Sequence, residues 1–574
     1  MTKSLSFGHQ EPAPPTSVAD ADADERTLPG RLSQRTSQAT LTPQSLPDGC
    51  SYGSIPSKDG EGAEKRVIWV DFPPASPENP ICFSKSRKFL ITAVVLLYTF
   101  WCSSTASAFS ISAGTMCSHL HCRKFEAEAG IALYAWGAGI FPLIVAPLSE
   151  EFGRHPVYMF ALIMLFVFHL ANGVAKNMAT VLMSRFFLGA AGSIGTSVVG
   201  GTISDIFIPA HRGVPMAISG FIVYFATGLG GAVFGYVDVR ASWRWVWYVH
   251  TIGIGAMIPV VVFGLKETRT DIILRRRAAK LRKERGLADG GVYMHASEVD
   301  KVSFWSAVTT SLYRPFIFLT TEPIVMFFSL WVALANQWSV FYVQIAGLPY
   351  MMRNLWGFNT EQVGLMYFTT CIGAVFGLCG GQIQEHLYRK KAPTRGIEAR
   401  LYAPMAGGIL FSIGCFITGF TALPNIHWIG SAVGQVVVIT SIFMIYVTAF
   451  TYVSECYGVF ASSAIAGQSS ARNLIGGCIA FATNTMFERM TPRWAIVMMA
   501  SFAAVLALVP FVAFFYGPQI RARSKYSKVL MQQERDAIDA ERIQREARGM
   551  DGHDFEDLEG DANGTTESHV KTKA

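Results

Sequence analysis

Two acids and an arginine stand close together in the stretch APLSEEFGRHP, which lies between two long apolar runs. Arg154 follows Glu150 by four residues, so the two side chains could face each other on one helical turn. Gly153 lets the chain bend tightly there. Asp205 and Arg212 stand in a second charged segment, TISDIFIPAHRG. Two acids and two arginines on one membrane face could form an interlocking gate; ordinary charge beside a membrane is the alternative.

Three ionisable residues fall inside apolar runs that are long enough to cross a membrane: Arg185, Glu322 and Arg472. An ionisable side chain at such a place is a functional hypothesis by default. Glu322 could carry a proton or extend to the aqueous surface. Arg472 could attract an anionic substrate or pair with Glu455. His169 also lies in an apolar run, and we expect it to have a structural role.

Polar and aromatic side chains gather in, and directly after, one apolar run that follows a basic segment. They are Trp331, Asn336, Gln337, Tyr342 and Gln344. The amides could donate hydrogen bonds to a ligand, and the rings could supply apolar contact. Packing within a helix bundle is the alternative for each of them.

The segment CSHLHC, from Cys117 to Cys122, is the one place where cysteine and histidine cluster. A disulfide, a metal site and no special role remain open for it. The sequence contains no G-x-x-x-x-G-K-[ST] loop and no G-x-S-x-G elbow, so ATP-driven transport and hydrolase chemistry are not expected. We expect no enzymatic activity and no cofactor, and a bound metal is the alternative for CSHLHC that we favour least.

The elements that position these residues are long apolar helices. Hydrophobic residues make up 51% of the 574-residue chain, and a membrane-spanning helix needs about 20 mostly apolar residues. Twelve such runs occur, at 89–112, 127–148, 156–175, 179–204, 214–237, 245–265, 316–341, 361–382, 402–422, 427–452, 461–486 and 493–516. The sequence therefore predicts an all-α membrane protein with twelve transmembrane helices.

Lysine and arginine concentrate in alternate connecting segments, such as LKETRTDIILRRRAAKLRKERG after the sixth run. By the positive-inside bias these segments are cytoplasmic, which places both termini in the cytoplasm. We prefer this explanation of the basic segment to nucleic-acid binding, because it lies between membrane spans.

The long segment after the sixth run divides the spans into six plus six, which suggests two packed bundles with a cavity between them. We expect disordered or charged tails outside them, because their composition lacks apolar periodicity. The predicted parts are an N-terminal tail 1–87, a first bundle 88–265, a basic central loop 266–315, a second bundle 316–516 and a C-terminal tail 517–574.

Several segments, in this order, resemble one known family. PLSEEFGRHP, SRFFLGAAGS, ATGLGGAVFGYV, WRWVWYVH, KETR, TEPIVMFFSLW and IEARLY are similar to motifs of the major facilitator superfamily, in the form seen in fungal drug:proton antiporters with twelve spans. The resemblance covers nearly all of the chain between the tails. It implies the superfamily fold of two six-helix bundles and proton-coupled export across the plasma membrane of a fungus.

The resemblance also implies roles for particular residues. Glu150, Arg154 and Asp205 would latch the two halves in one facing state, and Arg185 would be tied to proton coupling. Small residues at close spacing allow helices to approach each other; the candidates are Gly189, Gly228, Gly230, Gly231 and Gly235. At Gly231 the family usually has proline, so this chain departs from the fifth-span motif.

We therefore predict a secondary transporter that exports an amphiphilic small molecule, such as a drug, a secondary metabolite or a glycolipid, by alternating access. Polyamines, organic acids and amino acids are alternative substrates. A membrane sensor that does not transport, built on the same fold, is the alternative of another class. The expected partners are the substrate, protons and the lipid bilayer, with no nucleic acid, and we expect a monomer.

Overall fold

The computed structural model describes residues 46–56, 64–73, 76–208, 211–286, 291–298, 304–334, 345–457, 461–524 and 528. The chain divides into two compact units, 1–48 and 49–574, and only residues 46–48 of the first are described. Everything below concerns the second unit.

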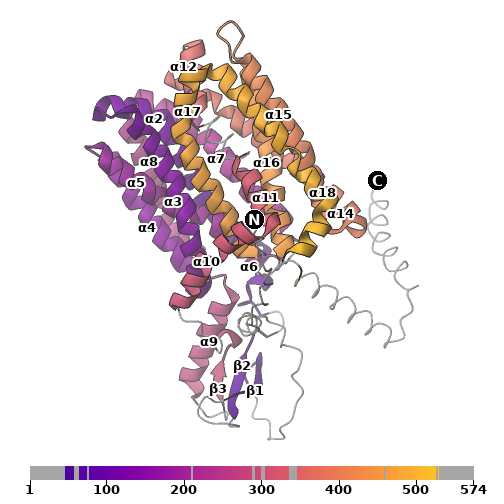
Figure 1. Cartoon of the computed structure of the whole chain (residues 1–574). Helices are drawn as coiled ribbons and strands as arrows, with labels where there is room; N and C mark the ends of the chain where they lie inside the picture. Colours follow the sequence, from indigo (N-terminus) through magenta and orange to yellow (C-terminus); the bar gives the residue numbers. More distant parts are fainter. Residues whose placement is uncertain are drawn as a thin grey trace, which may run out of the picture. The chain divides into compact units, whose positions relative to one another are not determined.

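Long apolar helices make up the first half of this unit (Figure 1). They are α2 (Lys85–Leu120), α3 (Lys124–Glu151), α4 (Arg154–Gly173), α5 (Met178–Gly192), α6 (Ile194–Ile206), α7 (Gly213–Arg240) and α8 (Trp243–Gly264). Side chains cap several of them: the Asn177 side chain accepts from the backbone N–H of Thr180 at the start of α5. Helices α5 and α6 follow each other directly and together make one candidate span.

The second half repeats this arrangement with more breaks. Its elements are α10 (Phe304–Thr321), α11 (Pro323–Val332), α12 (Leu348–Trp356), α13 (Thr360–Met366), α14 (Phe368–Arg395), the 3-10 helix η5 (Gly396–Leu401), α15 (Tyr402–Thr421), α16 (Ile429–Tyr457), α17 (Ala461–Leu506) and α18 (Val509–Arg523). Each half has its own buried hydrophobic core.

Ten helices within the described ranges are long and apolar enough to span a membrane, and a bent pair adds an eleventh. The last candidate covers 61 residues, which at 1.5 Å per residue is about three times the thickness of the hydrocarbon core. It contains a kink at Thr491, where φ is 64°, between the two spans that the sequence predicts there. The prediction of an all-α membrane fold is confirmed.

The predicted seventh span, 316–341, differs from the structure. Helix α10 begins at Phe304 and the chain turns by 94° before α11. Pro323 starts α11, where its missing N–H costs nothing because the first helical N–H groups have no partner in the helix. Residues 335–344 lie outside the described ranges.

A small sheet lies at one end of the helices (Figure 1). Strand β1 (Cys50–Pro56) pairs antiparallel with β2 (Glu64–Val70), and β2 pairs parallel with β3 (Val292–Met294). The prediction of a disordered tail over 1–87 is therefore wrong for this hairpin. The sequence did not predict the hairpin because it contains few apolar residues and because its partner strand, β3, lies far away in the sequence.

Helix α9 (Thr270–Arg285) contacts β2 and β3 beside this sheet. Val67, Ile68 and Tyr293 of the sheet are fully buried, as is Ala278 of α9. The described parts of the basic central loop, 270–285 and 292–298, thus form secondary structure. The short 3-10 helix η3 (Ala296–Glu298) contacts α9, and η1 (Pro80–Cys82) contacts α6. We call this end of the helices the sheet end and the opposite end the far end.

The two halves meet along two seams. In the first, α3 contacts α17; in the second, α7 contacts α13 and α14. The contacts along the first seam run antiparallel, from Phe125 stacked on Phe481 near the far end to Ser470 donating to the Gly139 carbonyl further along. The second seam runs from an Arg240–Glu361 ion pair at the far end towards the sheet end.

Candidate functional site

The charged hinge of the sequence forms a buried ion pair at the sheet end. Helix α3 ends at Glu151 and α4 begins at Arg154, whose Nε donates to Asp205 Oδ2 at 3.1 Å. The two side chains are only 7% and 9% exposed. Arg154 also donates to the Ser149 hydroxyl. The guanidinium lies against Gly201, where an added Cβ would approach within 2.7 Å. Arg154 therefore joins the α3–α4 turn to the end of α6.

Gly153 makes this turn possible because its φ of 101° is one that other residues rarely adopt. An added Cβ there would also meet the carboxylate of Glu267. Glu267 accepts from the backbone N–H of Arg154 at 2.9 Å and from those of Thr268 and Arg269 at 3.0 Å each. It thus caps the start of α4, where a carboxylate also interacts favourably with the helix dipole. The sequence motif KETR marked this residue, but no role was predicted for it.

The four-charge gate predicted from the sequence does not form as a single cluster. Glu150 is exposed, and among the described residues Arg154 makes its ion pair with Asp205 rather than with Glu150. The break between α3 and α4 removes the shared helical turn on which Glu150 and Arg154 were expected to face each other. Arg212 donates to the carbonyls of Phe207 and Ser204 at 3.0 and 2.9 Å, so it caps the end of α6.

A chain of charges connects the Arg154–Asp205 pair with the sheet. Arg269 lies 3.8 Å from Asp205 and 3.0 Å from Asp271. The ring of His295 reaches Asp271 at 3.5 Å and the Val70 carbonyl of β2 at 3.2 Å.

The hydrogen bond with His295 is the main cause that lowers the pKa of Asp271. Burial opposes protonation of His295, but its bonds to Asp271 and to the Val70 carbonyl outweigh burial and raise its pKa.

The second half carries a similar arrangement, which sequence reasoning missed. Arg400, at the start of the ninth predicted span, binds Glu455 at the end of α16 with Nε and NH2 distances of 2.6 and 2.5 Å. Glu385 lies 3.2 Å from the same guanidinium. Glu398 is buried in an ion pair with Arg521 of α18. The predicted alternative of a pair between Arg472 and Glu455 is wrong, because Glu455 is bound by Arg400.

Arg185 is buried in the first half, on α5. Its Nε donates to the Gly130 carbonyl at 3.0 Å and its NH1 to the Thr105 carbonyl at 3.3 Å. The guanidinium lies over the rings of Phe109 and Tyr134, each 4.3 Å away. Carbonyls and aromatic faces therefore hold this cation, and no carboxylate lies within 4.0 Å of it in the described part of the chain.

His169 stacks on a second buried histidine, His250, with ring centroids 5.1 Å apart. Each Nδ1 lies 2.7 Å from a backbone carbonyl of its own helix. Each Nε2 lies 3.0 to 3.2 Å from a hydroxyl of α2, that of Thr105 or Ser104. All four ring nitrogens have partners, which suits the structural role expected for His169.

Glu322 lies at the break between α10 and α11 and is 1% exposed. The Tyr457 hydroxyl donates to it at 3.0 Å, and the Ser524 hydroxyl donates to the same oxygen. These partners come from the ends of α16 and α18. The carboxylate is therefore enclosed near the sheet end and does not extend to the aqueous surface, which was one of the two roles that the sequence left open.

The predicted substrate residues lie in different surroundings. Trp331 is buried in the core of the second half, edge-on to Phe328. Arg472 of α17 lies over the Tyr446 ring at 4.8 Å, and its buried Nε has no hydrogen-bond partner in the part of the chain that the structure describes. Asn336, Gln337, Tyr342 and Gln344 lie outside the described residues.

The glycines of the fifth-span motif lie where α7 approaches its neighbours most closely. An added Cβ at Gly228 would lie 2.6 Å from Cys371 Sγ, and one at Gly231 would collide with the Tyr367 ring. Gly235 faces Gly364 in the same seam, whereas Gly230 faces Ser104 of α2. Gly189 lies against the Tyr134 carbonyl of α3. At Gly231, where the family usually has proline, α7 continues as helix.

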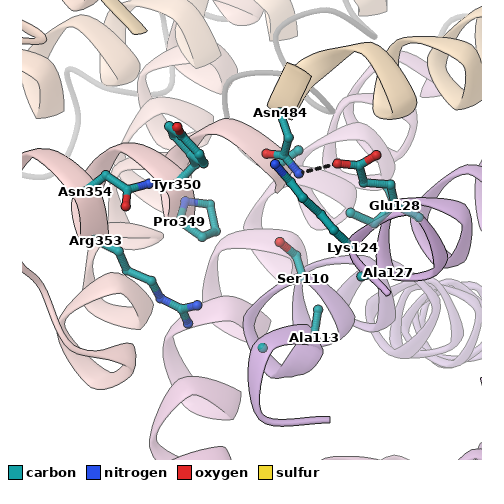
Figure 2. A pocket seen from close by; sticks show the side chains of 13 residues that line it. Ser110, Ala113, Lys124, Ala127, Glu128, Pro349, Tyr350, Arg353, Asn354 and Asn484 are labelled. Atoms are coloured by element: carbon teal, nitrogen blue, oxygen red, sulfur yellow. Dashed lines mark hydrogen bonds between the residues drawn. The ribbon is translucent and has the colours of Figure 1, made fainter. Parts of the chain in front are cut away.

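The far end has a pocket of about 250 Å³ between the two halves. Figure 2 shows Tyr350 and Arg353 of α12 on one side, and Lys124 and Glu128 of α3 on the other, with Asn484 of α17 bound to Glu128. Sequence reasoning missed this pocket, because nothing in the spacing joins α3 with α12. Nearby, Cys117 and Cys122 form a disulfide, which decides among the alternatives for that segment.

Comparison with known proteins agrees with this arrangement. The sequence model of the Major Facilitator Superfamily matches residues 91–481. The chain is 29% identical over 521 residues to the MFS-type efflux pump MFS2 of Trichophyton rubrum, covering 89% of this chain and 85% of that protein. It is 28% identical over 477 residues to the multidrug transporter mdrA of Aspergillus fumigatus, covering 82% and 77%.

Among solved structures, a D-xylose–proton symporter superposes with a TM-score of 0.55 at 14% identity, covering 74% of this chain and 97% of the symporter. A peptide transporter superposes with a TM-score of 0.53 at 14% identity, covering 75% and 94%. At these identities the likeness concerns the fold. Fold, order of motifs and family match agree: the chain belongs to the Major Facilitator Superfamily.

Proposed function

We propose that the protein is a proton-coupled exporter of amphiphilic small molecules that works by alternating access. The observation that carries the proposal is the repeat of one arrangement at the sheet end of both halves. In each half an arginine at a helix start binds an acid at the end of another helix: Arg154 binds Asp205 and Arg400 binds Glu455. A carrier of two facing states needs such contacts, because one end must be held closed and later released. The relatives named as efflux pumps support export as the direction.

The sheet end is cytoplasmic in this proposal. Helix α9, with the sequence TDIILRRRAAKLRKER, lies there, and an excess of lysine and arginine is typical of cytoplasmic segments. Both termini are then cytoplasmic and the far end faces the outside. The disulfide Cys117–Cys122 at the far end suits an oxidising compartment. We place the protein in the plasma membrane.

Gly153, Arg154 and Asp205 are the gating residues of the proposal, whereas Glu150 is exposed and Arg212 caps the end of α6. Glu267 joins them because it fixes the start of α4 and therefore the position of Arg154. Breaking the buried Arg154–Asp205 pair would leave a charge without a partner, so the pair holds one state until another interaction replaces it.

Proton coupling is assigned to Arg185 and Glu322. Both are buried and lie in different halves. The Tyr457 and Ser524 hydroxyls donate to the Glu322 carboxylate. Protonation would remove its negative charge and weaken these two hydrogen bonds, which would loosen the ends of α16 and α18. Arg185, fixed by carbonyls and rings, supplies a constant positive charge that disfavours a second cation nearby.

Arg472 is the substrate contact that we favour, because its buried Nε has no hydrogen-bond partner within the described ranges. An acceptor group on the substrate would satisfy it. Asn336, Gln337, Tyr342 and Gln344 remain candidate ligands on sequence grounds, and Trp331 a weaker one. The substrate, protons and the bilayer are the partners that the monomeric protein needs.

The test is transport by the purified protein in liposomes with an imposed proton gradient, using rhodamine 6G and Nile red as amphiphilic probes. We expect movement that depends on the gradient, and its loss in Arg154→Ala. Arg275→Ala is the matched control, since Arg275 forms a more exposed pair with Glu151 at the same end. A folded wild-type protein that moves no amphiphile under any gradient would favour the sensor instead.

A further inference from the structure

The far-end pocket is bordered by two opposite charges that have no ion-pair partner among the described residues. Glu128 comes from α3 of the first half and Arg353 from α12 of the second. Lys124, the third charged residue that lines the pocket, forms an ion pair with Glu488. Glu128 and Arg353 are therefore the two lining charges that a ligand could bind.

Glu128 is largely enclosed, since only 7% of the residue is exposed. Asn484 Nδ2 donates to its Oε1 at 2.9 Å, which is the contact drawn in Figure 2. No lysine, arginine or histidine nitrogen lies within 4.0 Å of its carboxylate in the part of the chain that the structure describes. A carboxylate kept out of water without a cation is costly, so it favours a cationic ligand group.

Arg353 has the opposite requirement. Its NH2 donates to the Thr360 hydroxyl at 3.2 Å, and no carboxylate oxygen of the described residues lies within 4.0 Å of it. Asp238, an acid that acts on it at longer range, is held by the Thr115 hydroxyl at 2.7 and 3.0 Å. Guanidinium groups bind carboxylates well because two N–H groups can donate in parallel.

The two charges lie on opposite walls of the pocket, and each is anchored to its own wall (Figure 2). The pocket between them, about 250 Å³, is smaller than the roughly 300–1,000 Å³ typical of whole drug-sized ligands. It fits a head group better than an entire amphiphile.

We propose that this pocket is an exit-side subsite for a zwitterionic head group, with an ammonium on Glu128 and a carboxylate on Arg353. Amphiphiles derived from amino acids have this chemistry. The inference rests on the proposed export function, because a far-end site contacts the substrate only on its way out.

The test measures binding to the full-length protein in lipid nanodiscs, without a proton gradient. Four probes share one dansyl group and differ in charge: Nε-dansyl-lysine is zwitterionic, dansylcadaverine cationic, dansyl-6-aminohexanoic acid anionic and N-butyl-dansylamide neutral. We expect the zwitterion to bind best. Glu128→Gln should weaken the binding of the zwitterion and the cation about tenfold or more, since a charge-assisted hydrogen bond is lost. Arg353→Gln should weaken the binding of the zwitterion and the anion for the same reason. Neither should affect the neutral probe.

Arg240→Gln and Glu361→Gln are the matched controls, because they remove the same charges from the same end outside the pocket. Equal affinities of the four probes for the wild type would overturn the proposal. A second result would also overturn it: both variants weaken the binding of all four probes equally, and a double variant with the two charges exchanged restores it. That pattern would show that Glu128 and Arg353 act on each other as a gate. Failure of the export proposal would appear separately, as absent gradient-driven transport in liposomes.

Discussion

The ion pairs at the sheet end of the two halves have similar partners but different surroundings. Arg154 and Asp205 are 7% and 9% exposed, whereas Arg400 and Glu455 are 15% and 30% exposed. The first pair is also connected through Arg269 to Asp271 and the sheet. The comparison teaches that similar ion pairs in the two halves need not contribute equally to stability. The first pair is buried and connected to the sheet, whereas the second has more access to water.

The largest expected effect comes from breaking each of the two ion pairs in a separate variant and comparing the losses of stability. Arg154→Ala leaves Asp205 buried without its main partner, and should destabilise the first half by about 3–5 kcal/mol. Arg400→Ala should cost less, about 1–3 kcal/mol, because water reaches Glu455. Thermal unfolding in nanodiscs measures both. Equal losses, or a larger loss for Arg400→Ala, would remove the distinction between the pairs.

A smaller effect is expected from the residue that positions the first pair. Glu267→Ala removes the acceptor of several backbone N–H groups at the start of α4 and should cost about 0.5–2 kcal/mol, as other helix caps do. The transport rate should fall strongly even though the loss of stability is small, because Arg154 loses its fixed position. Glu267→Gln, which keeps an acceptor oxygen, should recover most of the stability. A variant with unchanged transport would show that the cap does not serve the gate.

The smallest effect concerns the connection to the sheet. The pKa of His295 is raised and that of Asp271 is lowered. The His295 contribution is therefore fully present below its ordinary pKa of about 6.5 and is lost as pH rises through the raised value. The Asp271 contribution is present above about 3.9 and is lost as pH falls through the lowered value.

The pair is therefore strongest between about pH 4 and 6.5, and partial exposure keeps its worth under about 1 kcal/mol. His295→Gln should lower the unfolding temperature more at pH 5.5 than at pH 8.0. His386→Gln is the control, because His386 is another histidine of a basic segment. A difference between wild type and His295→Gln that does not change with pH would exclude this coupling.

The helices were predictable because a run of about 20 apolar residues has few other uses. The Arg154–Asp205 pair was within reach too, since both residues lie at the ends of predicted spans. Glu150 was assigned to the same pair because four-residue spacing was taken to mean one continuous helix, whereas α3 ends between the two. Local spacing cannot show where a helix breaks.

Contacts between residues that lie far apart in the sequence could not be predicted. Nothing near Glu128 indicates Asn484, and nothing near Arg400 indicates Glu455, because these contacts exist only once the helices are packed. The break at Glu322 was missed for a different reason: the run on both sides of it is apolar, and a proline at that point is compatible with either a new helix or a kink.

The pairing of β2 with β3 has a consequence for how the protein is made. His295, next to β3, contacts the Val70 carbonyl of β2 across 225 residues of chain. At about 5–20 residues per second, a ribosome needs roughly 11–45 s to synthesise that stretch. During this interval the hairpin has emerged but its third strand does not yet exist, while the whole first bundle enters the membrane. An unpaired strand edge is a site of unwanted association, so the sheet can close correctly only if the nascent hairpin waits on the side of the membrane to which the central loop is later delivered.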